Sequence, residues 1–294
     1  MSRFTLKDLE SLSGIKSDTI RIWEHRYRLL SPHLTKTGRR WYEDSDLKRL
    51  LNISVLYYSG VKISRIAKMT GEEIESRTMT LSEGHRKPEN IIAALIMGMN
   101  SFDENAVNDL LMKCLINKGL ENTFTEIVFP FLNKVGLLWQ TGSINVAKEH
   151  FVSGIFRQKL FSALDSLPPN TGKSGKKVLL FLPEGEFHEL GLLFFSLLIR
   201  KNGHNVIYLG QSVPYDSVVE TAETWIPDFV VTGNLTSLNM KDSGSYLKKL
   251  STALPEQKIY AGGEMAHSAR KLKLKNVKPL FVLSDLDFLY NLKP

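Results

Sequence analysis

Five short apolar runs occupy residues 177–294, and they constrain the fold more strongly than any other feature of the chain. Each run is rich in Val, Leu, Ile, Phe or Tyr, which favours a buried strand. Between the first two, the amphipathic segment Glu189–Asn202 is followed by Gly203, a common helix stop. Strands that alternate with helices predict a doubly wound parallel sheet, whose ligands lie beyond the carboxyl ends of the strands. The runs cover Lys177–Leu182, Asn205–Gly210, Asp228–Gly233, Lys258–Gly263 and Pro279–Ser284.

Two other blocks precede this one. Residues 1–75 are basic at the front and have a helical pattern, and residues 88–167 are helical with little sign of strands. The polar segment 76–87 and the Pro-, Gly- and Ser-rich segment 168–176 have the composition of linkers. The chain is therefore expected to form three domains, of which 177–294 is the last.

The charge is unevenly distributed along the chain. The net charge is +7, and residues 1–42 hold nine Lys and Arg against four Asp and Glu, whereas the remainder holds 29 against 27. A local cationic excess favours a polyanionic partner. A single cysteine, Cys114, excludes an intrachain disulfide framework and a Cys-rich zinc site. With no signal-peptide core and no apolar run near the roughly 18–20 residues that span a bilayer, we expect a cytoplasmic protein without a membrane partner.

The first block has the pattern of a DNA-binding module. Thr5–Leu12 predicts a short helix that ends at a Ser13-Gly14 turn, and Ser17 or Asp18 is placed to cap a second helix. Two short helices joined by a glycine-containing turn are typical of a helix-turn-helix. The polar stretch Pro32–Tyr42 predicts a hairpin whose arginines can reach phosphates or a narrow minor groove.

The same residues resemble the MerR-type winged helix-turn-helix. The match runs, in order, through Phe4-Thr5-Leu6, Leu9, Gly14-Ile15, Thr19–Tyr27, Pro32 and Gly38–Tyr42. The resemblance implies that the second helix enters the major groove, where the fork of Arg21 suits the O6 and N7 edge of guanine. Trp23, Trp41 and Tyr42 have an alternative interpretation as core aromatics. The expected phosphate or sugar contacts are Lys16, Ser17, Thr19, Arg26, Tyr27, Arg39, Arg40 and Tyr42.

The loop after the first apolar run carries Glu186, His188 and Gly191 in a Glu-x-His-x-x-Gly pattern. This pattern resembles the cobalamin-binding domain of the methionine synthase and mutase type. The resemblance implies that His188 is an axial ligand of cobalt and that Glu186 bonds the far ring nitrogen, which fixes the tautomer. It also implies that Gly191 lets the backbone pass close to the corrin. The alternative is that His188 is a structural loop histidine in a domain that has lost its ligand.

The family pattern continues with Ser-x-Leu and then Gly-Gly. At the family's spacing this chain has Gly233-Asn234-Leu235 and, further on, Gly262-Gly263, each at the end of an apolar run. The resemblance therefore adds Gly233, Leu235, Gly262 and Gly263 to the expected cofactor site. Gly233 replaces the family serine, and Thr236 and Ser237 are the nearby hydroxyls that could substitute for it.

The helical block carries Trp139 and, after nine intervening residues, Glu149-His150. This spacing resembles the helical bundle of the CarH/CarA-type light-responsive regulators, which join the same modules in the same order. The resemblance implies that a four-helix bundle caps the upper face of the corrin. Trp139 would pack against a 5′-deoxyadenosyl group, and Glu149 and His150 would line its pocket. Gln140 stands where the best-known members have a histidine, and an amide is a poor ligand for cobalt(III). Light is thus expected to act through adenosyl loss alone or through His150.

Together these patterns predict a winged helix-turn-helix, a four-helix bundle and a flavodoxin-like, doubly wound sheet of five parallel strands. The expected function is that of a DNA-binding transcriptional repressor, not an enzyme, that senses adenosylcobalamin and light. Cobalamin-dependent assembly into a dimer or tetramer would link several DNA modules and raise operator avidity. The alternative is a MerR-like regulator whose cobalamin-type domain is a ligand-free scaffold for oligomerisation or partner binding. A cobalamin enzyme or carrier is disfavoured, because the chain has no substrate barrel.

Overall fold

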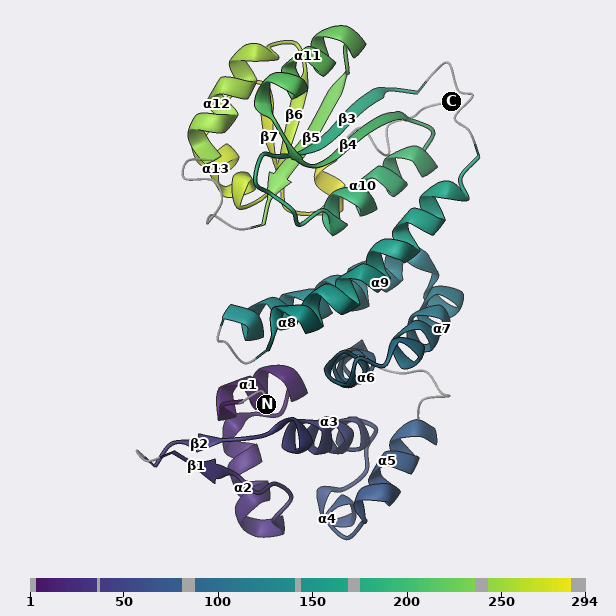
Figure 1. The fold of residues 1–294 in the computed structure, drawn as a ribbon, viewed down its shortest axis with the longest axis vertical. Coiled ribbons are helices and arrows are strands. Elements are labelled where there is room, and N and C mark those ends of the chain that lie inside the picture. Colours follow the sequence, from purple (N-terminus) through teal and green to yellow (C-terminus); the bar gives the residue numbers. More distant parts are fainter. Residues whose placement is uncertain are drawn as a thin grey trace. The chain divides into compact units, whose positions relative to one another are not determined.

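A computed structural model describes residues 4–35, 38–80, 88–140, 144–168, 175–235 and 243–286. The chain divides into two compact units, residues 1–155 and 156–294, so that the long helix α9 contributes to both (Figure 1). The first unit is almost wholly helical, and the second is built around one sheet. No helix in the described part of the chain is long and apolar enough to cross a membrane.

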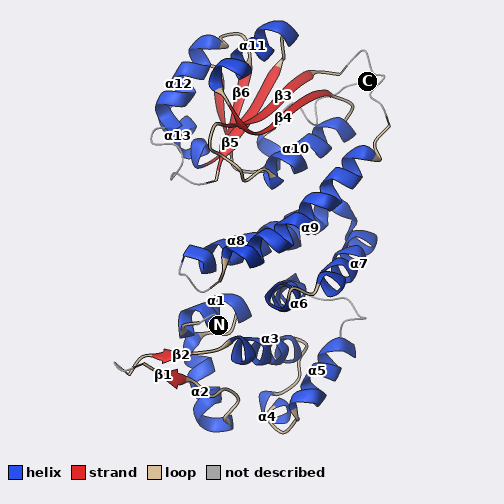
Figure 2. Cartoon of the chain, in the orientation of Figure 1, coloured by secondary structure: helices blue, strands red, loops and turns tan. Residues whose placement is uncertain are grey.

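The front of the first unit is a pair of short helices followed by a two-stranded hairpin. Thr5 caps α1 in a reciprocal capping box, in which Asp8 accepts from the Thr5 backbone at 2.6 Å. The expected cap of α2 is wrong, because the helix begins at Ser17, whose hydroxyl donates to Glu10 instead. The hairpin pairs antiparallel, as predicted, with His33 opposite Trp41 (Figure 2). The elements are α1 (Leu6–Ser13), α2 (Ser17–Tyr27), β1 (His33–Leu34) and β2 (Arg40–Trp41).

Among the described residues, seven further helices and one π-helical turn follow in residues 44–165. The helix α3 packs against α6, and α1 packs against α6 and α8, so the DNA-type module and the helical region share one unit. The helix α5 ends at Thr80, inside the segment expected to be a linker. The elements are α3 (Asp44–Tyr58), α4 (Ile63–Ile66), α5 (Gly71–Thr80), α6 (Pro88–Ser101), α7 (Glu104–Thr123), η2 (Phe124–Val128), α8 (Phe129–Gln140) and α9 (Val146–Asp165).

The second unit contains the predicted five-stranded parallel sheet, with strand order β4-β3-β5-β6-β7. This order is the flavodoxin-like one, with a topological switch point between β3 and β5. The last strand is displaced from its predicted position and ends at Leu280. It lies at the sheet edge, where Pro279 is tolerated because its missing N–H has no neighbouring strand to bond. The strands are β3 (Lys177–Pro183), β4 (Asn205–Val213), β5 (Phe229–Asn234), β6 (Lys258–Gly263) and β7 (Val277–Leu280).

Helices cover both faces of the sheet (Figure 1). Side chains alternate along β3, so that Leu180 packs toward α10 while Leu179 and Phe181 pack toward α11, α12 and α13. A strand that is buried on both faces reads as a continuous apolar run, which explains why the sequence identified it. The remaining elements are α10 (Leu190–Lys201), α11 (Tyr215–Trp225), α12 (Ser243–Ala253), α13 (Glu264–Leu272) and the 3-10 turn η3 (Leu283–Asp285).

Candidate functional site

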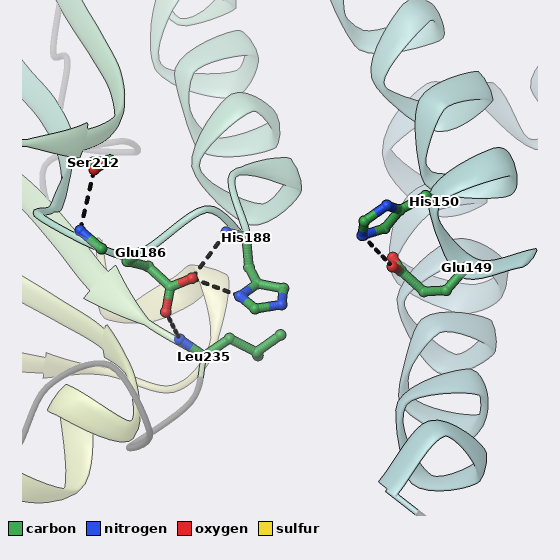
Figure 3. Close-up of polar contacts among 7 residues, drawn as sticks. Glu149, His150, Glu186, His188, Ser212 and Leu235 are labelled. Atoms are coloured by element: carbon green, nitrogen blue, oxygen red, sulfur yellow. Dashed lines mark hydrogen bonds and ion pairs between the residues drawn. The ribbon is translucent and has the colours of Figure 1, made fainter. Parts of the chain in front are cut away.

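The loop between β3 and α10 holds a histidine on a buried carboxylate (Figure 3). Glu186 is 2% exposed, and its Oε1 accepts from the backbone N–H of His188 at 2.8 Å. The same oxygen lies 2.5 Å from Nδ1 of the His188 ring. One carboxylate oxygen thus fixes both the backbone and the imidazole of His188.

The other oxygen of Glu186 ties this loop to the end of β5. Its Oε2 accepts from the backbone N–H of Leu235 at 2.9 Å. Burial alone would raise the pKa of the Glu186 carboxyl, but hydrogen bonds from the side chain and backbone of His188 and from Leu235 lower it to about 2. Glu186 is therefore a carboxylate at neutral pH, and it joins two loops at the carboxyl end of the sheet.

The donor set around His188 suits a metal that brings its own equatorial ligands. The His188 side chain is 45% exposed, and Glu186 holds its ring through Nδ1, which is how an outer carboxylate orients a metal-binding histidine. The described part of the chain holds no cluster of three or more His, Cys, Asp or Glu side chains that could hold an ion. One histidine held by a buried carboxylate fits the axial contact to a metal that a macrocycle already holds.

The glycines predicted for the site fall into two kinds. A Cβ on Gly233 would lie 2.9 Å from the carbonyl oxygen of Gly262, its partner in the neighbouring strand, and a Cβ on Gly263 would lie 2.0 Å from that of Asn234. Both are required by the protein itself. A Cβ on Gly191 would meet nothing within 4 Å among the described residues, so no described side chain or strand requires glycine there. Thr236 and Ser237 lie outside the described residues.

Ser212 supports the same loop and was missed by the sequence analysis. Its Oγ accepts from the backbone of Gly185 at 3.1 Å, and its own N–H donates to the carbonyl of Glu186 at 3.0 Å. Ser212 has a φ of 53° and lies where the pairing of β4 with β3 shifts register. Such irregularities re-aim side chains at sheet edges. Inspecting the polar residues that follow the second apolar run would have identified it.

A second buried carboxylate follows His188 directly. Glu189 is 6% exposed; it accepts from the Tyr208 hydroxyl at 2.7 Å, and its Oε1 lies 3.0 Å from Nε of Arg157. Burial, and then the hydrogen bond to Glu189, raises the pKa of Tyr208 above its usual range. No sequence spacing indicated this triad, because its members come from α9, the start of α10 and β4.

Of the three helical residues expected to face a cofactor, Trp139 and His150 are exposed and Glu149 is half-buried. The Trp139 ring, near the end of α8, is 44% exposed, and the His150 side chain is 73% exposed. Nε2 of His150 lies 3.6 Å from Oε2 of Glu149, whose other oxygen accepts from Ser153 (Figure 3). The side chain of Gln140 lies outside the described residues.

The DNA-type module presents basic groups on α2 and on the hairpin. Arg21 is exposed and lies 3.9 Å from Asp18, one turn earlier on α2. Nε of Arg40 lies 3.7 Å from Glu24, which secures the hairpin to α2. The guanidinium of Arg26 lies 5.6 Å from the centre of the Tyr27 ring. The other predicted contacts, Lys16, Ser17, Thr19, Tyr27 and Arg39, are exposed or half-exposed.

The aromatic residues of this module separate into core and surface. Tyr42 is completely buried and its hydroxyl donates to Glu24, so the structure gives it a role inside the module instead of the predicted DNA contact. Trp23 is a core residue, 5% exposed. Trp41 is only half-buried and stacks on His33, with ring centres 4.4 Å apart.

Three family models match the chain in succession. Residues 4–73 match a MerR helix-turn-helix family regulatory protein. Residues 89–162 and 176–282 each match a B12 binding domain. The two B12 matches cover the helical region and the sheet, which are the parts that carry Trp139 and His188.

Two curated relatives match over most of their length. The HTH-type transcriptional repressor CarH of Myxococcus xanthus is 34% identical over 264 residues, which span 87% of this chain and 87% of the relative. The repressor CarA of the same organism is 22% identical over 267 residues, or 88% of this chain and 85% of the relative. Among solved structures, the Methanosarcina barkeri monomethylamine corrinoid protein has a similar fold, with a TM-score of 0.54 and 16% identity. It aligns over 66% of this chain and 93% of its own.

Proposed function

The chain belongs to the family of MerR-type, cobalamin-binding transcriptional repressors that includes CarH, and we propose that it represses transcription from an operator in response to cobalamin. Cobalamin binding is supported by the pairing of His188 with the buried carboxylate of Glu186 at the carboxyl end of the sheet. Ligands of doubly wound sheets bind at that edge.

Four residues of the sheet unit would hold the cofactor, each through a different contact. His188 would coordinate cobalt through Nε2, and Glu186 would fix its tautomer and raise its basicity. Leu235, 60% exposed at the neighbouring loop, offers apolar contact area to the corrin. Gly191 leaves room for the backbone to approach it.

The adenosyl form is the specific ligand in this proposal. Bound adenosylcobalamin supplies a light-cleavable cobalt–carbon bond, and the protein supplies the surroundings of that bond. Trp139 would cover the adenosyl group with apolar area, while Glu149 and His150 would line the remainder. Loss of the group would leave an exposed indole without its contact, which is the event we propose to weaken assembly and DNA binding.

Assembly into a dimer or tetramer would set the affinity for the operator. A single module of this size makes few base contacts, whereas several linked modules bind one operator with a high effective concentration. DNA affinity would therefore follow the oligomeric state, and the oligomeric state would follow the cofactor.

Retention of the cofactor tests this function directly. The purified chain is mixed in the dark with adenosylcobalamin, desalted, and examined by visible spectroscopy. We expect a coloured eluate from the native protein, little colour from His188→Ala, and full colour from His267→Ala, which removes a histidine of α13. A colourless native eluate would instead support the ligand-free scaffold.

A second measurement tests the output. Mobility shifts with the chain's own promoter region, in the dark and after illumination, are combined with light scattering on the same samples. We expect larger oligomers and tighter DNA binding for the dark, loaded protein. Equal affinity and equal size before and after light would exclude light control.

A further inference from the structure

The helix α2 presents one continuous face away from the protein. Ile20 is fully buried and Trp23 is 5% exposed, and these two residues fix the rotation of the helix. Trp23 also packs edge-on against Tyr57 of α3, with ring centres 5.0 Å apart. The opposite side, which we call the outer face of α2, consists of Asp18, Arg21, Ile22 and His25, spaced as i, i+3, i+4 and i+7.

Ile22 is the only apolar member of this outer face, and it is 56% exposed. Single exposed apolar residues are common on protein surfaces, so exposure alone indicates nothing. Its position is informative. Ile22 adjoins Arg21 in the middle of the second helix of a MerR helix-turn-helix, which is the element that enters the major groove.

The major groove offers one prominent apolar group on the base edges, the 5-methyl group of thymine. Arginine and acidic side chains form hydrogen bonds with the polar base edges, whereas an aliphatic side chain makes its favourable contact with that methyl group. Isoleucine is β-branched and therefore has a strongly preferred rotamer in a helix, so that little freedom is lost on contact. The anchoring of α2 by Ile20 and Trp23 holds this rotamer in a fixed direction.

We propose that Ile22 is a specificity-determining residue that reads a thymine methyl group in each half-site of the operator, beside the base contacted by Arg21. This inference rests on the proposed DNA-binding function. It predicts that the operator contains a thymine that contributes to binding through its methyl group and not through its hydrogen-bonding edge.

Deoxyuridine substitution tests the inference, because it removes the methyl group and keeps the base pair. The full-length chain is titrated with duplexes from its own promoter region, footprinted first, in which one thymine position at a time is replaced in both half-sites. For the native protein we expect one position at which replacement weakens binding about fourfold per half-site, the value of one buried methyl. Ile22→Ala should bind the native duplex about as weakly and should show no further loss at that position, and Ile22→Val should lie between.

The matched control is Leu34→Ala, which removes an aliphatic side chain that is 65% exposed on the hairpin. It should keep the native sensitivity to deoxyuridine. Because Ile22 is exposed, its variants should have native circular dichroism and melting. Native protein that is insensitive at every position, or Ile22→Ala that remains as sensitive as the native protein, would overturn the inference alone. Failure of the native protein to bind the promoter in any cofactor or light state would overturn the proposed DNA function with it.

Discussion

The buried carboxylate of Glu186 accepts a hydrogen bond from the backbone N–H of Leu235, at 2.9 Å, across the switch point of the sheet. Since its other oxygen holds both the ring and the backbone of His188, one side chain aligns the two loops on which a corrin would rest. The orientation of the His188 ring therefore depends on a carboxylate that is 2% exposed.

Replacement of Glu186 by glutamine should weaken cobalamin binding about 10- to 100-fold, the range found for partners of metal-bound histidines. A neutral amide cannot place a negative charge beside the imidazole. Absorbance titration of the purified chain measures the effect. Glu184→Gln, an exposed neighbour in the same loop, should bind as the native protein does. Equal affinities for the two variants would contradict the role of Glu186.

Restoring the family serine at position 233 should harm this chain. A Cβ there would lie 2.9 Å from the Gly262 carbonyl oxygen, so the Gly233→Ser strand must shift, at a cost of about 1–3 kcal/mol in the free energy of unfolding. Denaturant unfolding of the cofactor-free protein checks this value.

The opposite result is expected for Gly191→Ala. The added methyl meets no atom within 4 Å in the described part of the chain, so the free energy of unfolding without cofactor should not fall, whereas cobalamin retention should fall. A destabilised Gly191→Ala variant would show that the fold itself requires glycine at position 191. A fully stable Gly233→Ser variant would show that strand packing does not require glycine at position 233.

Sequence patterns predicted the elements that depend on local periodicity. The strands β3, β4, β5 and β6 were placed within a few residues, while β7 was displaced, because Pro279 and the turn that follows it blur its limits. The cap of α2 was misjudged for a related reason. The hydroxyl of Ser17 finds a partner on α1, and a local rule cannot anticipate a partner from another helix.

Several buried polar contacts of the structure join residues that are far apart in the sequence, so local patterns did not predict them. Tyr42 was predicted to contact DNA, with a core position as the alternative, and the structure buries it against Glu24 of α2. The triad around Glu189 likewise unites residues that no motif connects. No sequence motif separated Ile22 from its neighbours in the second helix. Its offset from the buried Ile20 and Trp23 is the helical-wheel signal that separates it from the core.

Removing the Tyr208 hydroxyl should destabilise the sheet unit. Tyr208→Phe deprives the buried Glu189 carboxylate of a hydrogen-bond donor that the structure places 2.7 Å away, which should cost about 1–3 kcal/mol in the free energy of unfolding. Tyr215→Phe is the control, because that hydroxyl makes an exposed hydrogen bond to Lys249, and its loss should cost less than about 0.5 kcal/mol. Denaturant unfolding compares them. Equal stability of the two variants would mean that Arg157 alone satisfies Glu189.

Lys148 offers a test of how the cofactor surface communicates with the DNA module. It is 8% exposed at the start of α9, and its Nζ lies 3.2 Å from Asp44, the first residue of α3, and 3.2 Å from Asn100 of α6. The next two residues are the Glu149 and His150 of the proposed adenosyl pocket. One turn of α9 therefore joins that pocket to the helix that follows the hairpin.

Lys148→Met should retain cobalamin normally but should reduce the difference in operator affinity between the dark and the illuminated protein, because the start of α9 is no longer tied to Asp44. Parallel DNA titrations in both states measure this ratio. Lys113→Met removes the same charge from an exposed position on α7, so it corrects for lost attraction to phosphate and should leave the ratio unchanged. A ratio that stays native in Lys148→Met would show that the signal reaches the DNA module by another route, such as oligomerisation alone.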